Sequence, residues 1–194
     1  MSLILFIDGE NFKKKCGEIL QASHVEDIDW TRFDFKGLLS SVLEGFKPER
    51  KIFYAAKIIR HPQTAEKSEK LIQQQRLLKT HLEKQGFEFL LSGRVRGHEE
   101  RDPSSGRTLL VFKEKGVDVK LAVDLVTLAC DGVLKQAIIG SSDSDLQPAI
   151  KELANRGVDT IYLGFELTPN KGLTYTTKRT ILIRNSEVLK YYFR

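Results

Sequence analysis

Clustered aspartates are the residues of this sequence whose types and spacing could do chemistry. Asp8 ends a short apolar run, and Asp143 and Asp145 follow a second apolar run that ends at Gly140. Two carboxylates so close together repel each other unless a cation or hydrogen bonds offset the repulsion. Because no His or Cys lies beside them, they favour a hard cation such as Mg²⁺ or Mn²⁺. Such a cation activates water for attack on phosphorus, so the pattern indicates phosphodiester hydrolysis.

A third acidic segment carries two aspartates on one expected helix. Asp118 lies at or near the start of that helix, and Asp124 follows six residues later, on a different helix face. We expect Asp118 to reach the same crevice as Asp8, because the start of a helix can abut the carboxyl edge of a parallel sheet. Asp124 is expected either to support that site from outside or to be a solvated charge.

Some of these residues also have a purely structural interpretation. Asp8 and Gly9 form a common turn pair, and Asn11 could cap the helix that follows. In the second cluster, Ser144 and Gln147 have the spacing of a capping box. Capping does not explain why two further carboxylates crowd the same turn, so a metal site is favoured there.

Three acidic motifs occur in order along the chain: FIDGEN at 6–11, KGVDVKLAVD at 115–124 and SSDSDLQPAI at 141–150. Together they resemble the signatures of NYN domains, which belong to the wider PIN-like nuclease fold. The resemblance covers about residues 1–165 and implies a compact α/β/α sandwich that cleaves RNA with Mg²⁺ or Mn²⁺. Ser142 departs from a frequent Gly of the family, and Leu146 from a common Phe, which bears on loop geometry and substrate choice.

The resemblance also implies roles for individual residues. The acidic positions that bind metal and carry catalysis are Asp8, Asp118, Asp143 and Asp145. The supporting positions are Asn11, Ser141 and Asp124. Asp8 and Asp143 follow from their places at strand ends, whereas Asp118 and Asp145 depend on the resemblance.

Basic residues lie in or near the segments that flank these motifs. The net charge of +5 and the pI of about 9.1 favour a polyanionic partner, here single-stranded or structured RNA. Any single Lys or Arg can equally belong to a solvated surface, so only their collective placement argues for RNA. The candidate phosphate contacts are Lys13, Lys14, Lys15, Arg94, Arg96, Arg101, Arg107, Lys115 and Lys120.

The elements that must position these residues alternate between short apolar runs and amphipathic segments, which is typical of an α/β protein. We expect a three-layer α/β/α sandwich around a mainly parallel central sheet, with the acids beyond the carboxyl ends of its strands. The predicted strands are 3–7, 51–59, 87–91, 137–140 and 158–164, with helices from residue 12 and at 35–46, 64–85, 117–130 and 146–156.

We expect residues 1–194 to form a single domain, with a basic loop or hairpin at about 93–113 and a basic C-terminal extension at about 170–194. That extension is expected to add a final strand or helix. No run of about eighteen apolar residues and no basic leader occurs, which predicts a cytoplasmic protein without a membrane partner. The sequence leaves open whether the chain forms a homo-oligomer.

Two other functions stay open beside the nuclease. A catalytically inactive PIN-like module could bind RNA or a protein partner, because a fold does not guarantee activity. A haloacid-dehalogenase-like phosphatase would share the α/β fold, the Mg²⁺ and a late acidic motif. That enzyme needs a second Asp two residues after its nucleophile, and Glu10 stands there instead.

Overall fold

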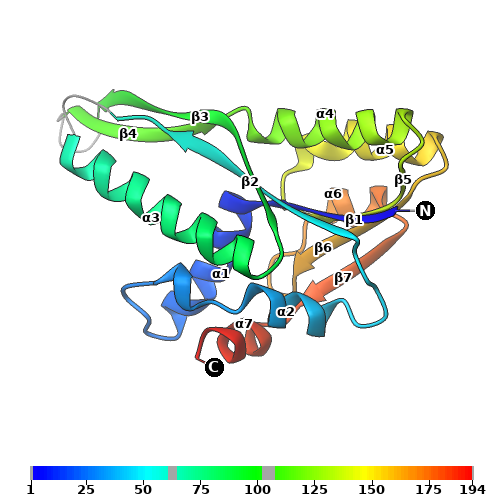
Figure 1. Ribbon diagram of the computed structural model, residues 1–194, viewed down its shortest axis with the longest axis horizontal. Helices are drawn as coiled ribbons and strands as arrows, with labels where there is room; N and C mark the ends of the chain where they lie inside the picture. Colours follow the sequence, from blue (N-terminus) through cyan, green and yellow to red (C-terminus); the bar gives the residue numbers. More distant parts are fainter. Residues whose placement is uncertain (1, 61–64, 102–107, 194) are drawn as a thin grey trace.

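A seven-stranded sheet runs through the protein in the order β4-β3-β2-β1-β5-β6-β7 (Figure 1). The computed structural model describes residues 2–60, 65–101 and 108–193, with backbone alone at 96–101 and 108–114. Six described strands are parallel, and β4 runs antiparallel to β3 at one edge. The strands are β1 Ser2–Asp8, β2 Arg50–Ile58, β3 Glu88–Arg101, β4 Thr108–Lys115, β5 Leu134–Gly140, β6 Asp159–Phe165 and β7 Arg179–Ile183.

Helices cover both faces of this sheet. One face carries α1, α2, α3 and α7, and the other carries α4, α5 and α6 (Figure 1). The predicted three-layer α/β/α sandwich around a mainly parallel sheet is therefore confirmed. The helices are α1 Gly9–Ala22, α2 Phe35–Val42, α3 Ala65–Lys84, α4 Val117–Cys130, α5 Gln147–Asn155, α6 Lys171–Thr176 and α7 Asn185–Tyr192, with short 3-10 turns η1 Trp30–Arg32 and η3 Ser144–Leu146.

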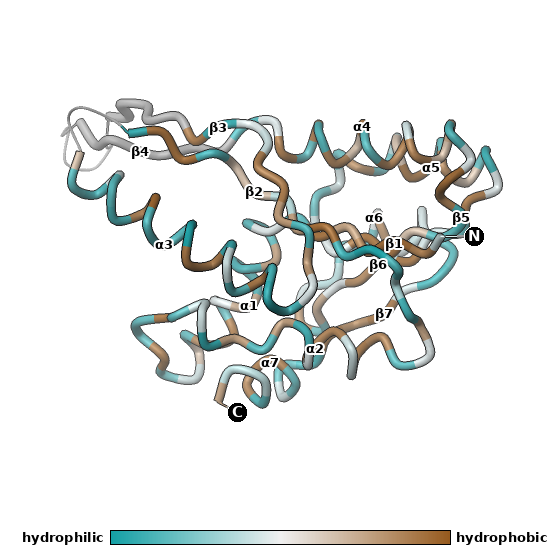
Figure 2. Tube along the Cα trace, viewed as in Figure 1, coloured by the Kyte–Doolittle hydropathy of each residue, from teal (hydrophilic) through white to brown (hydrophobic). Residues whose placement is uncertain are grey.

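The central strand β1 is buried on both faces, as its unbroken apolar run predicts. Leu5 and Ile7 pack into the core under α1 and α2, whereas Ile4 and Phe6 pack into the core under α4 and α5. Successive strand side chains point to opposite faces, so one run of apolar residues supplies both cores. Figure 2 shows apolar residues concentrated along the central strands, while α3 is mostly hydrophilic.

An aromatic cluster joins the helices on the α1 face to the sheet. The ring of Phe35, at the start of α2, lies 4.7 Å from that of Phe33 and 5.9 Å from that of Phe53 in β2. Phe12 of α1 and Phe87 also lie within ring contact of Phe35, each at 6.5 Å. Phe35 is fully buried, so it connects two helices and the sheet through one side chain.

Strand β3 is much longer than the predicted run at 87–91, because it continues into the polar stretch that follows. It pairs with β4 from Arg94 opposite Lys115 to Arg101 opposite Thr108. Gly93 has φ +68°, and a Cβ there would lie 2.2 Å from the carbonyl oxygen of Lys115. Only glycine fits this close approach, which brings the two strands together at the base of the hairpin.

The chain after residue 170 forms a strand as well as two helices. β7 is the edge strand beside β6, and α7 buries Val188, Tyr191 and Tyr192 in the core under α1 and α2. The backbone N–H of Asp34 donates to the carbonyl of Tyr191 at 3.0 Å, which ties α7 to the start of α2. Within the described ranges, no helix has both the length and the apolar character needed to cross a bilayer.

We expect the substitution Phe35→Ala to lower the free energy of unfolding by about 3–5 kcal/mol, because it empties the centre of the aromatic cluster. Phe193, which is 61% exposed, supplies the matched control. Phe193→Ala is expected to change that free energy by about 0.5 kcal/mol or less. Urea unfolding measures both, and equal losses for the two variants would contradict the central role of Phe35.

Candidate active site

The carboxyl ends of β1 and β5 form the point at which strand order reverses. From β1 the sheet continues through β2 and β3 on one side and through β5, β6 and β7 on the other. Loops at such a point diverge and leave a crevice, which is where open α/β sheets bind ligands. Asp8 is the last residue of β1, and Ser141 follows Gly140, the last residue of β5 and the strand partner of Ile7.

Asp8 is held by donors from two different elements. The backbone N–H of Asn11 donates to Oδ1 of Asp8 at 3.1 Å, and the Ser141 hydroxyl donates to Oδ2 at 3.3 Å. The helix predicted from residue 12 therefore begins earlier, at Gly9, with Asp8 as its N-cap. Gly9 permits this immediate turn, since a Cβ there would lie 2.1 Å from the ring of Phe53.

Two asparagines fix the loop that follows β5. Asn11, expected to cap a helix, instead accepts the N–H of Ser142 on its side-chain oxygen at 3.1 Å. Asn170 donates from its side-chain nitrogen to the carbonyl of Ser142 at 2.8 Å, and its oxygen caps α6. The sequence analysis missed Asn170. Its capping position could be found from local pattern, but its contact with a loop 28 residues away could not.

Asp143 is the capping residue of this loop, not Ser144 as the spacing with Gln147 predicted. The carboxylate of Asp143 accepts the N–H of Asp145 at 2.9 Å, and Ser144 lies inside the short turn η3. The N–H of Asp143 donates in turn to the hydroxyl of Ser141 at 3.1 Å, which links Asp143 to Asp8 through one serine. The side chain of Asp145 is exposed.

The electrostatic surroundings of Asp8 are unfavourable to its negative charge. Burial raises the pKa of the Asp8 carboxyl above its usual value, the hydrogen bonds from Asn11 and Ser141 oppose that rise, and the charges of Asp143 and Glu10 add to it. Asp143 and Glu10 thus both repel the charged form of Asp8. A bound cation would offset this repulsion, and carboxylate oxygens are the ligands that Mg²⁺ prefers.

Asp118 and Asp145 both line a groove of about 680 Å³ between α4 and α5. Asp118 lies in the first turn of α4, as predicted, and half-buried. In the part of the chain with described side chains, no three His, Cys, Asp or Glu residues lie close enough together to hold a metal ion. The charge of Asp143 thus acts on Asp8, and Asp118 and Asp145 line one groove, but no three of these acids cluster closely enough among the described side chains to hold a metal ion.

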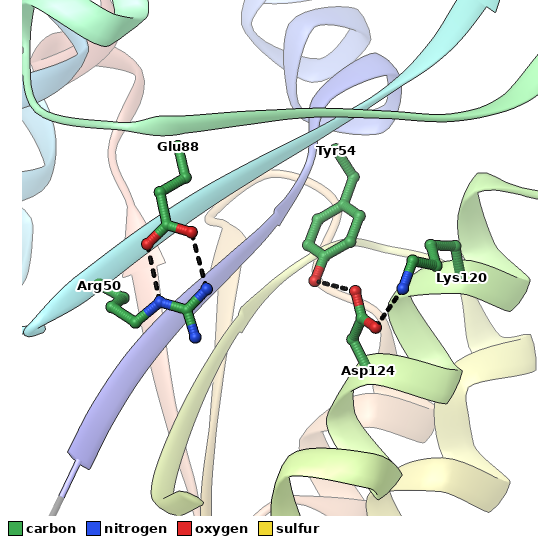
Figure 3. A network of polar contacts seen from close by, with 5 residues as sticks. All are labelled: Arg50, Tyr54, Glu88, Lys120 and Asp124. Carbon is green, nitrogen blue, oxygen red and sulfur yellow. Dashed lines mark hydrogen bonds and ion pairs between the residues drawn. The ribbon is translucent and has the colours of Figure 1, made fainter. Parts of the chain in front are cut away.

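Asp124 belongs to a separate polar network on the sheet-facing side of α4. Tyr54 donates its hydroxyl to Oδ2 of Asp124 at 2.9 Å, and Lys120 contacts Oδ1 at 2.5 Å (Figure 3). Burial raises the pKa of Tyr54 well above its usual value, and the charge of Asp124 raises it further, so Tyr54 stays a proton donor. Tyr54 is also the strand partner of Asp8, which places this network beside the same edge.

The comparisons with known proteins identify the family and the fold. The NYN domain family matches residues 2–183. The chain belongs to the NYN domain family. Members of this family are generally nucleases with a PIN-like fold, so the aspartates at the β1 edge lie in a nuclease-type domain.

A solved structure shows the same fold in another protein. This NYN domain resembles a crystal structure of a protein of unknown function from Vibrio parahaemolyticus, with a TM-score of 0.58 and 18% identity. The match covers 93% of this chain and 91% of that one, and at this identity it supports the fold alone. Comparison with the curated proteins gave no significant match.

The basic residues expected to contact RNA in this NYN domain differ in whether an acidic side chain already pairs with them. Lys13, Lys15 and Lys120 lie in ion pairs with Glu10, Glu18 and Asp124, respectively. Lys14 is exposed on α1, and Arg94 and Lys115 are exposed strand partners directly before the start of α4. Arg96 and Arg101 lie on β3, where the backbone alone is described, and Arg107 lies outside the described residues.

We expect Asp8→Asn to raise the melting temperature of the metal-free protein near neutral pH by a few degrees. A raised pKa in the folded state means that Asp8 is best tolerated protonated, at low pH, and costs stability as the pH rises through that pKa. The advantage of Asp8→Asn should therefore shrink as the pH is lowered toward the usual pKa of Asp. In a domain of this size, roughly 1 kcal/mol corresponds to about 2–4 °C.

Thermal unfolding in EDTA between neutral and acidic pH measures this difference. Asp131→Asn is the matched control, because Asp131 is exposed beyond the end of α4, at the opposite edge of the sheet. A lower melting temperature for Asp8→Asn than for the wild type at neutral pH would show that Asp8 is not strained by burial.

Proposed function

We propose that this NYN domain is a metal-dependent ribonuclease that hydrolyses RNA phosphodiester bonds at the edge formed by β1 and β5. The observation that carries the proposal is Asp8, an 8% exposed carboxylate at the switch point of the sheet, whose negative charge is repelled by Asp143 and Glu10. Strained carboxylates in a crevice are typical of functional sites. Membership of a nuclease family narrows that function to cleavage of nucleic acid.

The residues fit a lightly coordinated Mg²⁺ or Mn²⁺. Mg²⁺ often binds through one or two carboxylates and keeps several waters and substrate phosphate oxygens as its other ligands. Asp8 and Asp143 would hold the ion, since the Ser141 hydroxyl links the Asp8 carboxylate to the backbone N–H of Asp143. Asp118 and Asp145 are proposed as the further acidic ligands, on the side of the α4–α5 groove. Two carboxylates suffice for the first ion, so a third close carboxylate is not required.

In this mechanism the chain mainly positions groups. A bound Mg²⁺ or Mn²⁺ supplies Lewis acidity to phosphate oxygens and activates water. Asn11 and Ser141 hold the Asp8 carboxylate in one orientation. Asn11 accepts the N–H of Ser142, and Asn170 donates to the carbonyl of the same residue. These two hydrogen bonds fix the backbone beside Asp143 and so keep Asp143 in place. Such positioned charges contribute to catalysis because they need not reorganise during the reaction.

Supporting and RNA-binding roles extend the proposal along α4. Tyr54 and Lys120 fix the Asp124 carboxylate, so Asp124 supports the site from the sheet-facing side of the helix. Arg94 and Lys115 are proposed phosphate contacts, because they are exposed at the base of the β3–β4 hairpin, next to the start of α4. The other proposed contacts are Lys13, Lys14, Lys15, Arg96, Arg101, Arg107 and Lys120.

A catalytically inactive RNA-binding module is the second candidate. The observation that favours it is that no three acidic side chains converge in the described part of the chain. This candidate predicts RNA binding without cleavage and without dependence on Asp8. The phosphatase alternative is weaker, because Glu10 is exposed and pairs with Lys13, so it does not share the buried position of Asp8.

The nuclease is tested by incubating labelled RNA with the protein and Mg²⁺ or Mn²⁺. We expect cleavage that EDTA abolishes, and that Asp8→Asn or Asp143→Asn reduces by about 100-fold or more. Asp131 lies at the amino ends of the parallel strands, far from the carboxyl ends that carry Asp8. The Asp131→Asn variant should therefore cleave RNA like the wild type. Binding without cleavage in every metal would support the inactive module, and full activity of both site variants would contradict the proposed site.

The RNA path is tested by charge reversal at the base of the hairpin. We expect Arg94→Glu with Lys115→Glu to weaken RNA binding and to reduce the slope of log K against log salt by about 0.7 for each lost phosphate contact. The matched double variant is Lys47→Glu with Lys135→Glu, at exposed positions near the opposite ends of the strands. Equal slopes of log K against log salt for the two double variants would show that RNA binds to another surface.

A further inference from the structure

A large cleft lies on the other helical face of the sheet, between α1 and α3. Its volume is about 770 Å³, within the range of about 300–1,000 Å³ that small-molecule sites occupy. Its floor comes from β2 and β3, and its walls come from α1, α3 and the segment around η1. We call it the α1–α3 cleft. Among its lining residues are Glu10, Lys13, Trp30, Ala56, Gln74 and Phe89.

The α1–α3 cleft opens beside the candidate active site. Glu10 and Lys13, which line it, occupy the first two turns of the helix that Asp8 caps. Ala55 and Ala56, in its floor, follow directly after Tyr54, the strand partner of Asp8. A group that enters the cleft from this edge therefore lies next to a phosphate held at Asp8.

The walls of the α1–α3 cleft are suited to a flat, largely apolar ring. Trp30 is half-buried, and its indole lies 6.0 Å from the ring of Phe33 and 6.4 Å from that of Phe35, so it is packed in place. Phe89 stacks on Phe53 at 5.8 Å and offers a second aromatic side chain. Unpaired RNA bases bind to proteins by stacking on such side chains.

The polar groups of the α1–α3 cleft favour a neutral base over a phosphate. Glu10, Asp27 and Asp29 outnumber Lys13 and Lys70 in the lining, so a phosphate inside the cleft would face net negative charge. Carboxylates and the amide of Gln74 can instead accept or donate hydrogen bonds at the edge of a base. Arg94 and Lys115, the proposed contacts of the RNA phosphates at the base of the β3–β4 hairpin, lie outside this lining.

We propose that the α1–α3 cleft binds an unpaired nucleobase of the RNA strand whose adjoining phosphate lies at Asp8. The assignment rests on the proposed function of the Asp8 edge. It accounts for an aromatic cleft at the same strand ends as the acids. It also favours single-stranded RNA as the substrate, because a paired base enters only after unstacking and unpairing, which cost free energy. Base stacking there contributes affinity without strict sequence choice.

The tryptophan content allows a direct test of base binding. Trp30 is the one tryptophan in the sequence, so its fluorescence reports on the α1–α3 cleft alone. The Asp8→Asn variant is titrated with a short oligouridylate, with an abasic ribose-phosphate strand of the same length, and with uridine monophosphate. We expect quenching by the oligouridylate at much lower concentration than by the monophosphate, and none by the abasic strand.

Two adjacent glutamines on α3 provide a matched pair of variants. Gln74 lines the cleft and Gln73 does not, and both are exposed, so neither substitution disturbs the core. We expect Gln74→Glu to weaken oligouridylate binding about tenfold or more, because it removes an amide donor and adds negative charge to an already acidic lining. Gln73→Glu should bind within about twofold of the parent protein.

The outcomes separate the base site from the nuclease. Quenching without any cleavage by the wild type supports the base site and overturns the nuclease. Cleavage with no quenching, and with Gln74→Glu as active as Gln73→Glu, overturns the base site and leaves the nuclease standing. Equal quenching by the oligouridylate and the monophosphate would also overturn the assignment, because the cleft would then hold a free nucleotide and not a base of the strand.

Discussion

The burial of the Asp8 carboxylate is the constraint on which the carboxyl edge of the sheet depends. A buried charge is tolerated only where donors or opposite charges satisfy it. Its donors come from α1, through the N–H of Asn11, and from the loop after β5, through Ser141. One side chain of β1 therefore joins the elements on both sides of the switch point. The charges of Asp143 and Glu10 still repel the charge of Asp8, and a bound cation would offset this repulsion.

A second buried polar contact lies next to the first and behaves differently. Tyr54 and Lys120 supply Asp124 with a neutral donor and a positive charge, so this carboxylate is satisfied within the chain (Figure 3). Asp8 has two donors, and the charges of Asp143 and Glu10 repel its own. This difference separates a carboxylate that supports α4 from one that is available to a ligand, although both lie close to the end of β2.

The sequence predicts the layers and the strand ends because both follow from local patterns. Unbroken apolar runs marked β1 and β5, and the acids after them mark the edge where Asp8 and Ser141 meet. Contacts between distant residues left no such pattern. Asn170 reaches Ser142 across 28 positions, and Tyr54 resembles any core aromatic until Asp124 is seen beside its hydroxyl. The groove that Asp118 and Asp145 both line likewise depends on how α4 packs against α5.

The two faces of the sheet differ in their polar and apolar side chains. This difference indicates how an RNA strand would cross the carboxyl ends of the β-strands. The α1–α3 cleft lies on one face of the sheet, and Asp118 and Asp145 line the groove on the other. Asp8 lies between them at the end of the central strand β1. Arg94 and Lys115, at the open end of the β3–β4 hairpin, are close to the start of α4. A strand with a base in the cleft and its backbone toward α4 would thus pass Asp8 at a phosphate. In the proposed binding mode, the reversal of strand order at β1 would place both faces within reach of one RNA strand.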